Sequence, residues 1–296
     1  MTTPRPFGRS LCAMITPFDA SGALDVAAAA RHAVRLVADG CDGLVLNGTT
    51  GEAPTTSDAE KTALVRAVRK AVGPTVAVVA GVGSADTRHT VALAREAERA
   101  GADGLLVVAP YYSRPPQPAV EAHFRTVADT VDVPLMLYDI PGRTGVRIEV
   151  DTMLRLAEHP RIVAVKDCAQ DLAGSTKVIA NTSLAYYSGC EELNLPLYAV
   201  EGAGQVSTVA NAAPEALRAV LDAFDRGDTA RAARINRLTL PLVELMMASG
   251  LPGAVTAKAV LGAGSVRAPL QDADPQSVER LRRARETLLA HRDEWN

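Results

Sequence analysis

The sequence predicts an α/β fold: a closed (β/α)8 TIM barrel followed by a C-terminal helical extension. Short apolar runs alternate with helical stretches over most of the chain, and the runs are nearly continuous in Val, Leu and Ile. Strands of a parallel sheet that is buried on both faces have this composition, because helices cover each face. After about residue 226 the apolar runs stop and only helical patterns remain.

Eight apolar runs are candidates for the strands of the barrel. They cover residues 11–18, 42–48, 76–82, 104–110, 134–140, 162–168, 184–189 and 205–210. Eight strand–helix units in series favour closure into one barrel. An open, doubly wound sheet is the alternative fold, and the first run is not followed by the G-x-G-x-x-G that such folds use to bind dinucleotides.

The helical stretches between the runs carry their own signals. Leu64, Val68 and Val72 keep one face of a helix apolar. Ser57 stands three residues before Glu60, which is the spacing of a capping box at a helix start. A helix is therefore expected to begin just after Ser57.

The end of the chain predicts helices without strands. Residues 228–249, 252–261 and 277–291 have helical patterns, the last with apolar positions among charges. We therefore expect a barrel over residues 1–225 and a C-terminal helical extension over residues 226–296.

Composition restricts the class of protein. The 296 residues carry a net charge of −3 with both signs spread along the chain, so no nucleic-acid partner is expected. No apolar run approaches the ~18 residues of a membrane span. The first ten residues lack the apolar segment of a signal peptide, which predicts a cytoplasmic protein. The four cysteines show neither C-x-x-C nor histidine at ligand spacing, so no metal site is expected.

Two residues with reactive side chains end neighbouring apolar runs. Lys166 ends the sixth run, and a buried lysine is costly unless it is paired or neutral. A neutral amine is the nucleophile that forms a Schiff base, whereas an ion pair with Asp167 is the structural alternative. Tyr138 ends the fifth run, where a phenol can carry protons to a lysine adduct or can simply be a core tyrosine.

Polar loops follow other runs at the edge where barrel enzymes place their sites. Thr49 and Thr50 lie between glycines and can hold a carboxylate through hydroxyls and backbone N–H groups; a polar turn is the alternative. Tyr111 and Tyr112 follow the fourth run, where they line a pocket, meet a partner subunit or pack their own loop. Arg143 follows the fifth run and can clamp a carboxylate or stay solvated.

Five motifs occur in a fixed order along the chain. They are AMITPF at 13–18, GTTGE at 48–52, PYYSRPP at 110–116, YDIPGRTG at 138–145 and VKD at 165–167. With these motifs the chain resembles the dihydrodipicolinate synthase / N-acetylneuraminate lyase family of class I aldolases. The resemblance runs from about residue 10 to the C-terminal helices.

The resemblance implies a role for each matching residue. Lys166 would form an imine with pyruvate, so that no cofactor is needed. Thr49 and Thr50 would hold the pyruvate carboxylate. Tyr138, Thr50 and Tyr112 would form a proton relay, with Tyr112 supplied by the neighbouring subunit. The resemblance also implies a homotetramer built as a dimer of dimers.

The acceptor aldehyde is expected to be anionic. Arg143 would bind its carboxylate, and the YDIPGRTG motif is similar to the synthases of lysine biosynthesis, which use aspartate semialdehyde. A fixed cation suits an anionic aldehyde, whereas a sugar-derived substrate calls for neutral hydrogen-bonding groups. Gly189 and Val206 would line the pocket through their backbone carbonyls.

The sequence departs from the family pattern at three positions. Cys190 and Glu191 stand where the family usually has an aspartate pair, and Gln205 stands in a segment that is usually apolar. We expect these residues near the catalytic face, where they favour the alternative of a related pyruvate aldolase for another aldehyde. A catalytically idle binding protein is a weaker alternative, because Lys166 and Tyr138 are both present.

A regulatory site of the family also differs. Where lysine-inhibited members carry histidine, asparagine and glutamate ligands, this chain has Asp58, Lys61, Ala85 and His89. The resemblance therefore implies weak or absent feedback inhibition by lysine.

Overall fold

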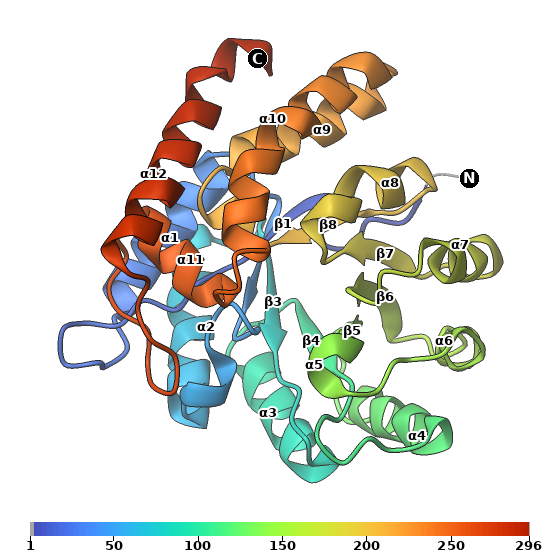
Figure 1. Ribbon diagram of the computed structural model, residues 1–296. Coiled ribbons are helices and arrows are strands. Elements are labelled where there is room, and N and C mark those ends of the chain that lie inside the picture. The colour runs from blue at the N-terminus through green and yellow to red at the C-terminus, as the bar shows by residue number, and fades with distance from the viewer. Residues whose placement is uncertain (1–2, 296) are drawn as a thin grey trace.

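The computed structural model, which describes residues 3–295, is a closed barrel of eight parallel strands (Figure 1). The barrel closes because β1 pairs with both β2 and β8. The predicted barrel is confirmed and the open sheet is wrong. The strands are β1 (Ser10–Ala13), β2 (Gly43–Leu46), β3 (Ala77–Gly81), β4 (Gly104–Val108), β5 (Leu135–Asp139), β6 (Ile162–Asp167), β7 (Ala185–Ser188) and β8 (Gly204–Ser207).

The first and eighth strands both end before their predicted runs do. β1 ends at Ala13, although the apolar run continues to residue 18, and this is the largest difference. The apolar run predicted residues 205–210, but β8 ends at Ser207 and a short 3-10 helix, η3 (Val209–Asn211), follows. The backbone turns there because Ala210 N donates to the Ser207 hydroxyl and Asn211 donates to Ala13 O. The apolar composition of Val209 and Ala210 therefore reflects their burial and not a strand.

Helices surround the strands in the order that the alternating pattern predicts (Figure 1). They are α1 (Val26–Ala38), α2 (Asp58–Val72), α3 (Thr87–Arg99), α4 (Gln117–Ala128), α6 (Val150–Leu156), α7 (Leu172–Asn181), α8 (Asn194–Ala199) and α9 (Pro214–Asp225). The capping box of α2 is confirmed: Glu60 N donates to the Ser57 hydroxyl at 3.2 Å, and Ser57 N donates to the Glu60 carboxylate at 2.8 Å.

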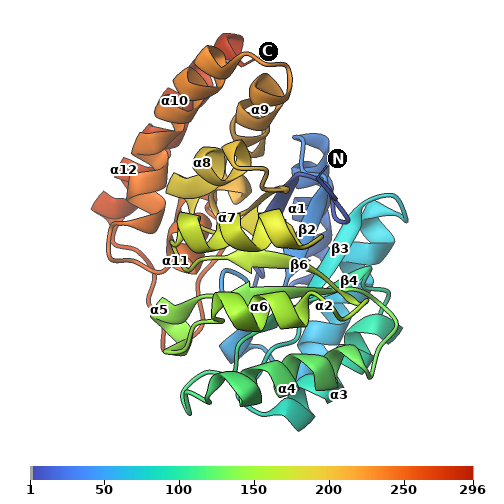
Figure 2. The ribbon, with the colours of Figure 1, turned by 90° about the vertical axis from the view of Figure 1, so that its right-hand side faces the viewer.

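Three long helices follow α9 and confirm that the chain ends in a helical extension. They are α10 (Thr229–Met247), α11 (Gly253–Leu261) and α12 (Pro275–Ala290). Figure 2 shows α11 at the same end of the barrel as α5 (Pro141–Thr144), the short helix after β5. The division at residue 225 stays a prediction. Within residues 3–295, no helix is long and apolar enough to cross a membrane.

The interior of the barrel is a packed core that is closed at the amino ends of the strands. Leu11, Val79 and Met136 belong to its apolar cluster. Tyr187 closes the amino end, where its hydroxyl donates to Gly8 O at 3.0 Å. The polar side chains that end β5 and β6 therefore lie at the opposite, carboxyl end, which is where barrel enzymes place their sites.

Candidate active site

Lys166 and Tyr138 are neighbours across the β5–β6 pair. They stand opposite each other in the register of the two strands, and each side chain is only 5% exposed. The Lys166 Nζ atom lies 4.4 Å from the centre of the Tyr138 ring. Because strand side chains alternate between faces and Ala164 packs in the barrel interior, Lys166 also points inward.

Lys166 has no carboxylate partner within ion-pair distance among residues 3–295. Asp167, the partner that the structural alternative required, points to the other face of the strand. There it accepts hydrogen bonds from the Ser175 hydroxyl at 2.5 Å and from Ala169 N at 2.8 Å. The ion-pair interpretation of Lys166 is therefore wrong. Burial lowers the pKa of Lys166, and the nearby Cys168 and Glu191 only partly oppose this effect.

Two cysteines and a glycine surround the Lys166 side chain. Cys168 follows β6, and Cys190 follows β7. A Cβ atom at Gly189 would contact the Cys168 sulfur and would lie 2.8 Å from Lys166 Cε, so only glycine fits there. A hydrogen bond with Cys190 and the charge of Lys166 hold the pKa of the Cys168 thiol below its ordinary value.

The loop after β2 brings Thr49 and Thr50 to the same end of the barrel. Thr50 is 6% exposed, and its hydroxyl oxygen lies 2.9 Å from that of Thr208. Burial raises the pKa of Tyr138 well above its ordinary value, and a hydrogen bond with the Thr49 side chain opposes this. The structure therefore brings Thr49, Tyr138 and Lys166 together, and Thr50 lies next to Thr49 at the same end of the barrel.

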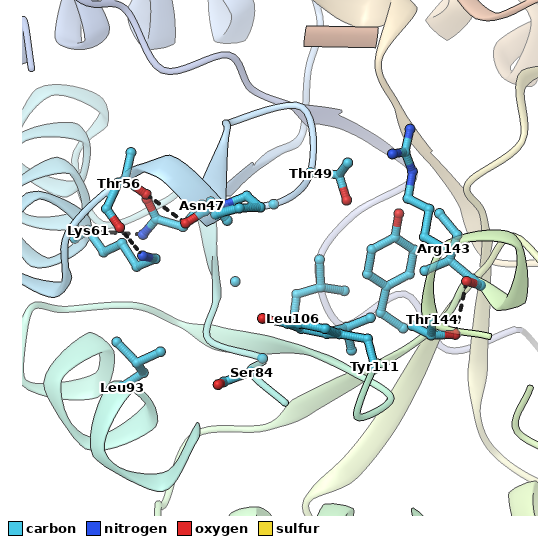
Figure 3. Close-up of a pocket in the computed structure, with 18 of the residues that line it drawn as sticks. Asn47, Thr49, Thr56, Lys61, Ser84, Leu93, Leu106, Tyr111, Arg143 and Thr144 are labelled. Atoms are coloured by element: carbon cyan, nitrogen blue, oxygen red, sulfur yellow. Dashed lines mark hydrogen bonds between the residues drawn. The ribbon is translucent and has the colours of Figure 1, made fainter. Parts of the chain in front are cut away.

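A cavity of about 480 Å³ opens beside these residues. Thr49, Tyr138 and Arg143 line one end of it, and Asn47 and Lys61 line the other, as Figure 3 shows for the four of these that it labels. Tyr138 is part of the cavity wall, but Lys166 is not. The amine of Lys166 lies against the ring of Tyr138. This volume lies in the range of small-molecule binding pockets.

Arg143 places a positive charge near both Lys166 and Tyr138. It lies on α5, whose short turn starts at Pro141 and ends at Gly145 in a left-handed conformation. Its positive charge acts to lower the pKa of both Lys166 and Tyr138, although burial has the larger effect on each. A guanidinium at the cavity wall suits the binding of a carboxylate.

Tyr111 and Tyr112 take different positions in the loop after β4. Tyr111 lines the cavity. Tyr112 has a left-handed backbone with φ at +74° and a side chain that is 94% exposed, so it points away from its own barrel. Within one chain the structure therefore does not bring Tyr112 to Thr50 or Tyr138.

Gly189 directly follows β7 and Val206 lies in β8, but Gln205 is not where the sequence predicted it. Val206 packs in the barrel interior. Gln205, the residue before it, therefore points outward, where it donates to the Ser10 hydroxyl at 3.1 Å. The expectation that Gln205 lies near the catalytic face was wrong, because β8 starts earlier than the apolar run indicated.

Sequence reasoning missed a second buried lysine near the site. Lys258 of α11 forms an ion pair with Glu52, with Nζ and Oε1 2.5 Å apart, and both side chains are buried. Glu52 ends the GTTGE motif, so the pair ties this loop to the C-terminal helices. A single lysine in the otherwise apolar sequence GAVTAKAVL was the signal that could have found it.

The family of the chain follows from comparison with known proteins. A sequence model described as the Dihydrodipicolinate synthetase family matches residues 6–287. The chain belongs to this family. A 4-hydroxy-tetrahydrodipicolinate synthase 1 from Streptomyces coelicolor is 69% identical over 290 residues, which are 96% of this chain and 95% of that protein.

Solved structures agree with this assignment to the dihydrodipicolinate synthetase family. The lysine-bound DHDPS from Cyanidioschyzon merolae is 35% identical, with a TM-score of 0.92 over 96% of this chain and 99% of that one. A chloride-inhibited dihydrodipicolinate synthase from Acinetobacter baumannii, complexed with pyruvate, is 31% identical, with a TM-score of 0.90 over 95% and 99% of the two chains.

Proposed function

We propose that the protein has 4-hydroxy-tetrahydrodipicolinate synthase activity. It is a lyase of the Schiff-base class that condenses pyruvate with L-aspartate-4-semialdehyde in the biosynthesis of lysine and diaminopimelate. The observation that carries this proposal is Lys166: a buried amine without a carboxylate partner in the described chain, set against Tyr138. The 69% identity to a synthase of this name supports the choice of reaction.

Lys166 starts the reaction on pyruvate. Its neutral amine attacks the ketone carbon, water leaves, and an iminium forms. The iminium is an electron sink, so a methyl proton is lost and an enamine results without any cofactor. Thr49 and Thr50 hold the pyruvate carboxylate through hydroxyl and backbone N–H groups. Gly189 and Val206 complete this end of the site with their backbone carbonyls.

Arg143 and Tyr138 act in the second half of the reaction. The guanidinium of Arg143 binds the carboxylate of the semialdehyde, and the enamine carbon attacks its aldehyde carbon. Tyr138 carries protons to and from the adduct, in a relay with Thr50 and Tyr112. The amine of the substrate then displaces Lys166 from the imine carbon, which closes the ring and returns the free lysine.

Two measurements test the reaction. Borohydride added with pyruvate should reduce the imine and attach the pyruvate carbons to Lys166, as located by peptide mass spectrometry. Turnover should then be compared for aspartate semialdehyde and for sugar-derived and aromatic aldehydes. The proposal requires the highest kcat/KM for aspartate semialdehyde. A protein without any label on Lys166 would instead be an idle barrel.

A related pyruvate aldolase for another aldehyde is the second candidate. The observation that favours it is Cys190, whose thiol forms a hydrogen bond with Cys168. Both thiols are close enough to influence the pKa of Lys166. Gln205 no longer supports it, because that side chain points away from the barrel interior. Preference for another aldehyde in the same panel, with the label still on Lys166, would decide for this candidate.

We also propose a cytoplasmic homotetramer, a dimer of dimers in which Tyr112 completes the site of a neighbouring subunit. The exposed side chain and left-handed backbone of Tyr112 support this, because they present the phenol to another molecule. Mixing inactive Lys166→Ala and Tyr112→Phe proteins should restore activity, since hybrid assemblies contain one complete site.

The matched control for this mixing experiment is Tyr138→Phe. Lys166 and Tyr138 come from the same chain, so a mixture of Lys166→Ala with Tyr138→Phe should stay inactive. Equal activity of the two mixtures, or full activity of a monomer in light scattering, would exclude the shared site.

We further propose that lysine inhibits the protein weakly or not at all. The end of the cavity away from Arg143 is lined by Lys61, Asp58 and His89, and His89 Nε2 lies 2.9 Å from an Asp58 oxygen. The cation of Lys61 repels the amino groups of a lysine ligand. A lysine titration of initial rates checks this, and strong inhibition below millimolar lysine would contradict it.

A further inference from the structure

Glu191 is a buried carboxylate that the proposed reaction does not use. It follows β7 at the start of the 3-10 helix η2 (Glu191–Leu193) and is 5% exposed. Within residues 3–295 no cation lies within ion-pair distance of it. A buried carboxylate is costly unless hydrogen bonds satisfy its oxygens. The hydrogen bonds of Glu191 therefore indicate its role in the fold.

The oxygens of Glu191 hold the turn that ends β8. Its Oε1 accepts hydrogen bonds from the Ser207 hydroxyl at 2.9 Å, from Thr208 N at 2.7 Å and from Val209 N at 3.0 Å. Its Oε2 accepts one from the Asn194 side chain at 3.1 Å. Three donors from one turn meet a single oxygen, so the carboxylate fixes the backbone position of Thr208.

The side chain of Thr208 is held on two further sides. Its hydroxyl oxygen lies 2.9 Å from that of Thr50, and both threonines are buried. Its methyl group faces the start of α11, where a Cβ atom at Gly253 would lie 3.1 Å from Thr208 Cγ2. Thr208 is therefore packed between the C-terminal helices and the loop that carries Thr50.

We propose that Glu191 and Thr208 are positioning residues that fix the hydroxyl of Thr50 for proton transfer. This inference rests on the proposed function, in which Thr50 stands between Tyr138 and the neighbouring Tyr112. A hydroxyl in a relay must keep its oxygen at hydrogen-bond distance from both partners. The bond to Thr208 fixes that oxygen whichever of the two hydroxyls donates.

Thr208→Val is the sharpest test, because valine has the shape of threonine without its hydroxyl. We expect kcat to fall about five- to tenfold, the effect of one lost hydrogen bond. The borohydride label on Lys166 should stay near that of the unchanged protein. The KM for pyruvate should change less than kcat, because the backbone N–H groups of Thr49 and Thr50 still hold the carboxylate. Thr208→Ser, which keeps the hydroxyl, should restore most of kcat. Thr239→Val removes a buried threonine hydroxyl in α10 and should leave kcat unchanged.

Glu191→Gln gives an independent readout. It should lower kcat in the same way, and its effect should not add to that of Thr208→Val in the double variant. The charge of Glu191 also acts to raise the pKa of Lys166, alongside Cys168 and Cys190 and against Arg143. The acidic limb of the pyruvate–borohydride reaction should therefore move to lower pH in Glu191→Gln and stay in place in Thr208→Val.

The exchange of pyruvate methyl protons in heavy water separates this inference from the proposed function, because enamine formation needs no aldehyde. If the unchanged protein exchanges these protons but does not turn over aspartate semialdehyde, the proposed function fails, and the exchange rates of the variants still test the positioning role. Equal rates for Thr208→Val and the unchanged protein would overturn the inference. An equal loss in Thr208→Ser would do so too, since packing would then be the cause.

Discussion

The molecule contains two buried lysines in apolar surroundings, and their partners differ. Lys258 lies in α11, where its amine meets the Glu52 carboxylate at 2.5 Å and donates to Ser265 O at 2.9 Å. Lys166 lies in β6, where its amine meets the face of Tyr138 and, within residues 3–295, no carboxylate at ion-pair distance. The two side chains are 5% exposed or less, so burial alone does not distinguish them.

The partner decides what each lysine can do. Burial lowers the pKa of both, but for Lys258 the hydrogen bond and the charge of Glu52 act to raise it again. The paired lysine joins the loop after β2 to the C-terminal helices through its ion pair with Glu52. For Lys166, Cys168 and Glu191 only partly oppose the effect of burial on the pKa, and we propose this lysine as the nucleophile.

The largest expected effect is the loss of activity in Lys166→Met. Without the amine no imine forms, so kcat/KM should fall by roughly 10⁴-fold or more, as when other enzymes lose a covalent nucleophile. The borohydride label should disappear in this variant. In the unchanged protein the label should be on Lys166 and not on Lys258. A label on both lysines would contradict the proposed difference in their reactivity.

The next effect is on stability and concerns the other lysine. Lys258→Met leaves the Glu52 carboxylate buried without its cation, which should cost about 3–5 kcal/mol of the free energy of unfolding. Adding Glu52→Leu removes the stranded charge and should recover much of this loss. Denaturant unfolding measures both steps. A loss below about 1 kcal/mol in Lys258→Met would show that the pair does not stabilise the fold.

The two lysines also show which features of the structure could be predicted from the sequence. All eight strands and Lys166 at the end of the sixth were predictable, because apolar runs and their polar ends are local patterns. Lys258 was not identified, because its partner Glu52 lies far away in sequence and only the fold brings them together. The end of β8 was misplaced for the same reason: the turn after Ser207 depends on Glu191, which comes from another loop.

Arg143→Ala should have a smaller effect that is confined to the second substrate. A charge-assisted hydrogen bond contributes about 1.5–3 kcal/mol, so the KM for aspartate semialdehyde should rise roughly ten- to a hundredfold. The KM for pyruvate should change little, because Thr49 and Thr50 hold that carboxylate. Arg147→Ala is the matched control, since Arg147 pairs with Asp171 on the outside of the barrel. A rise in the KM of pyruvate instead would assign Arg143 to the first substrate.

The smallest effect concerns the acidity of Lys166. Burial lowers its pKa, and Cys168 is the largest opposing influence, followed by Glu191 and Cys190, with Arg143 acting in the same direction as burial. Cys168→Ser removes the thiol group that acts to raise the pKa of Lys166. The acidic limb of the pyruvate–borohydride reaction should therefore move to lower pH. Cys41→Ser, at a buried cysteine outside the site, should leave the limb in place, and movement of the Cys168→Ser limb to higher pH would contradict the assignment.

Gly189 also has a consequence for the design of inhibitors. A Cβ atom at this position would lie 2.8 Å from Lys166 Cε, so a substitution that blocks a drug there would also displace the proposed nucleophile. A mutation at residue 189 that weakens binding of a compound packed against this glycine is therefore expected to lower activity as well. Resistance would have to arise at contacts farther from the lysine, such as those with Arg143.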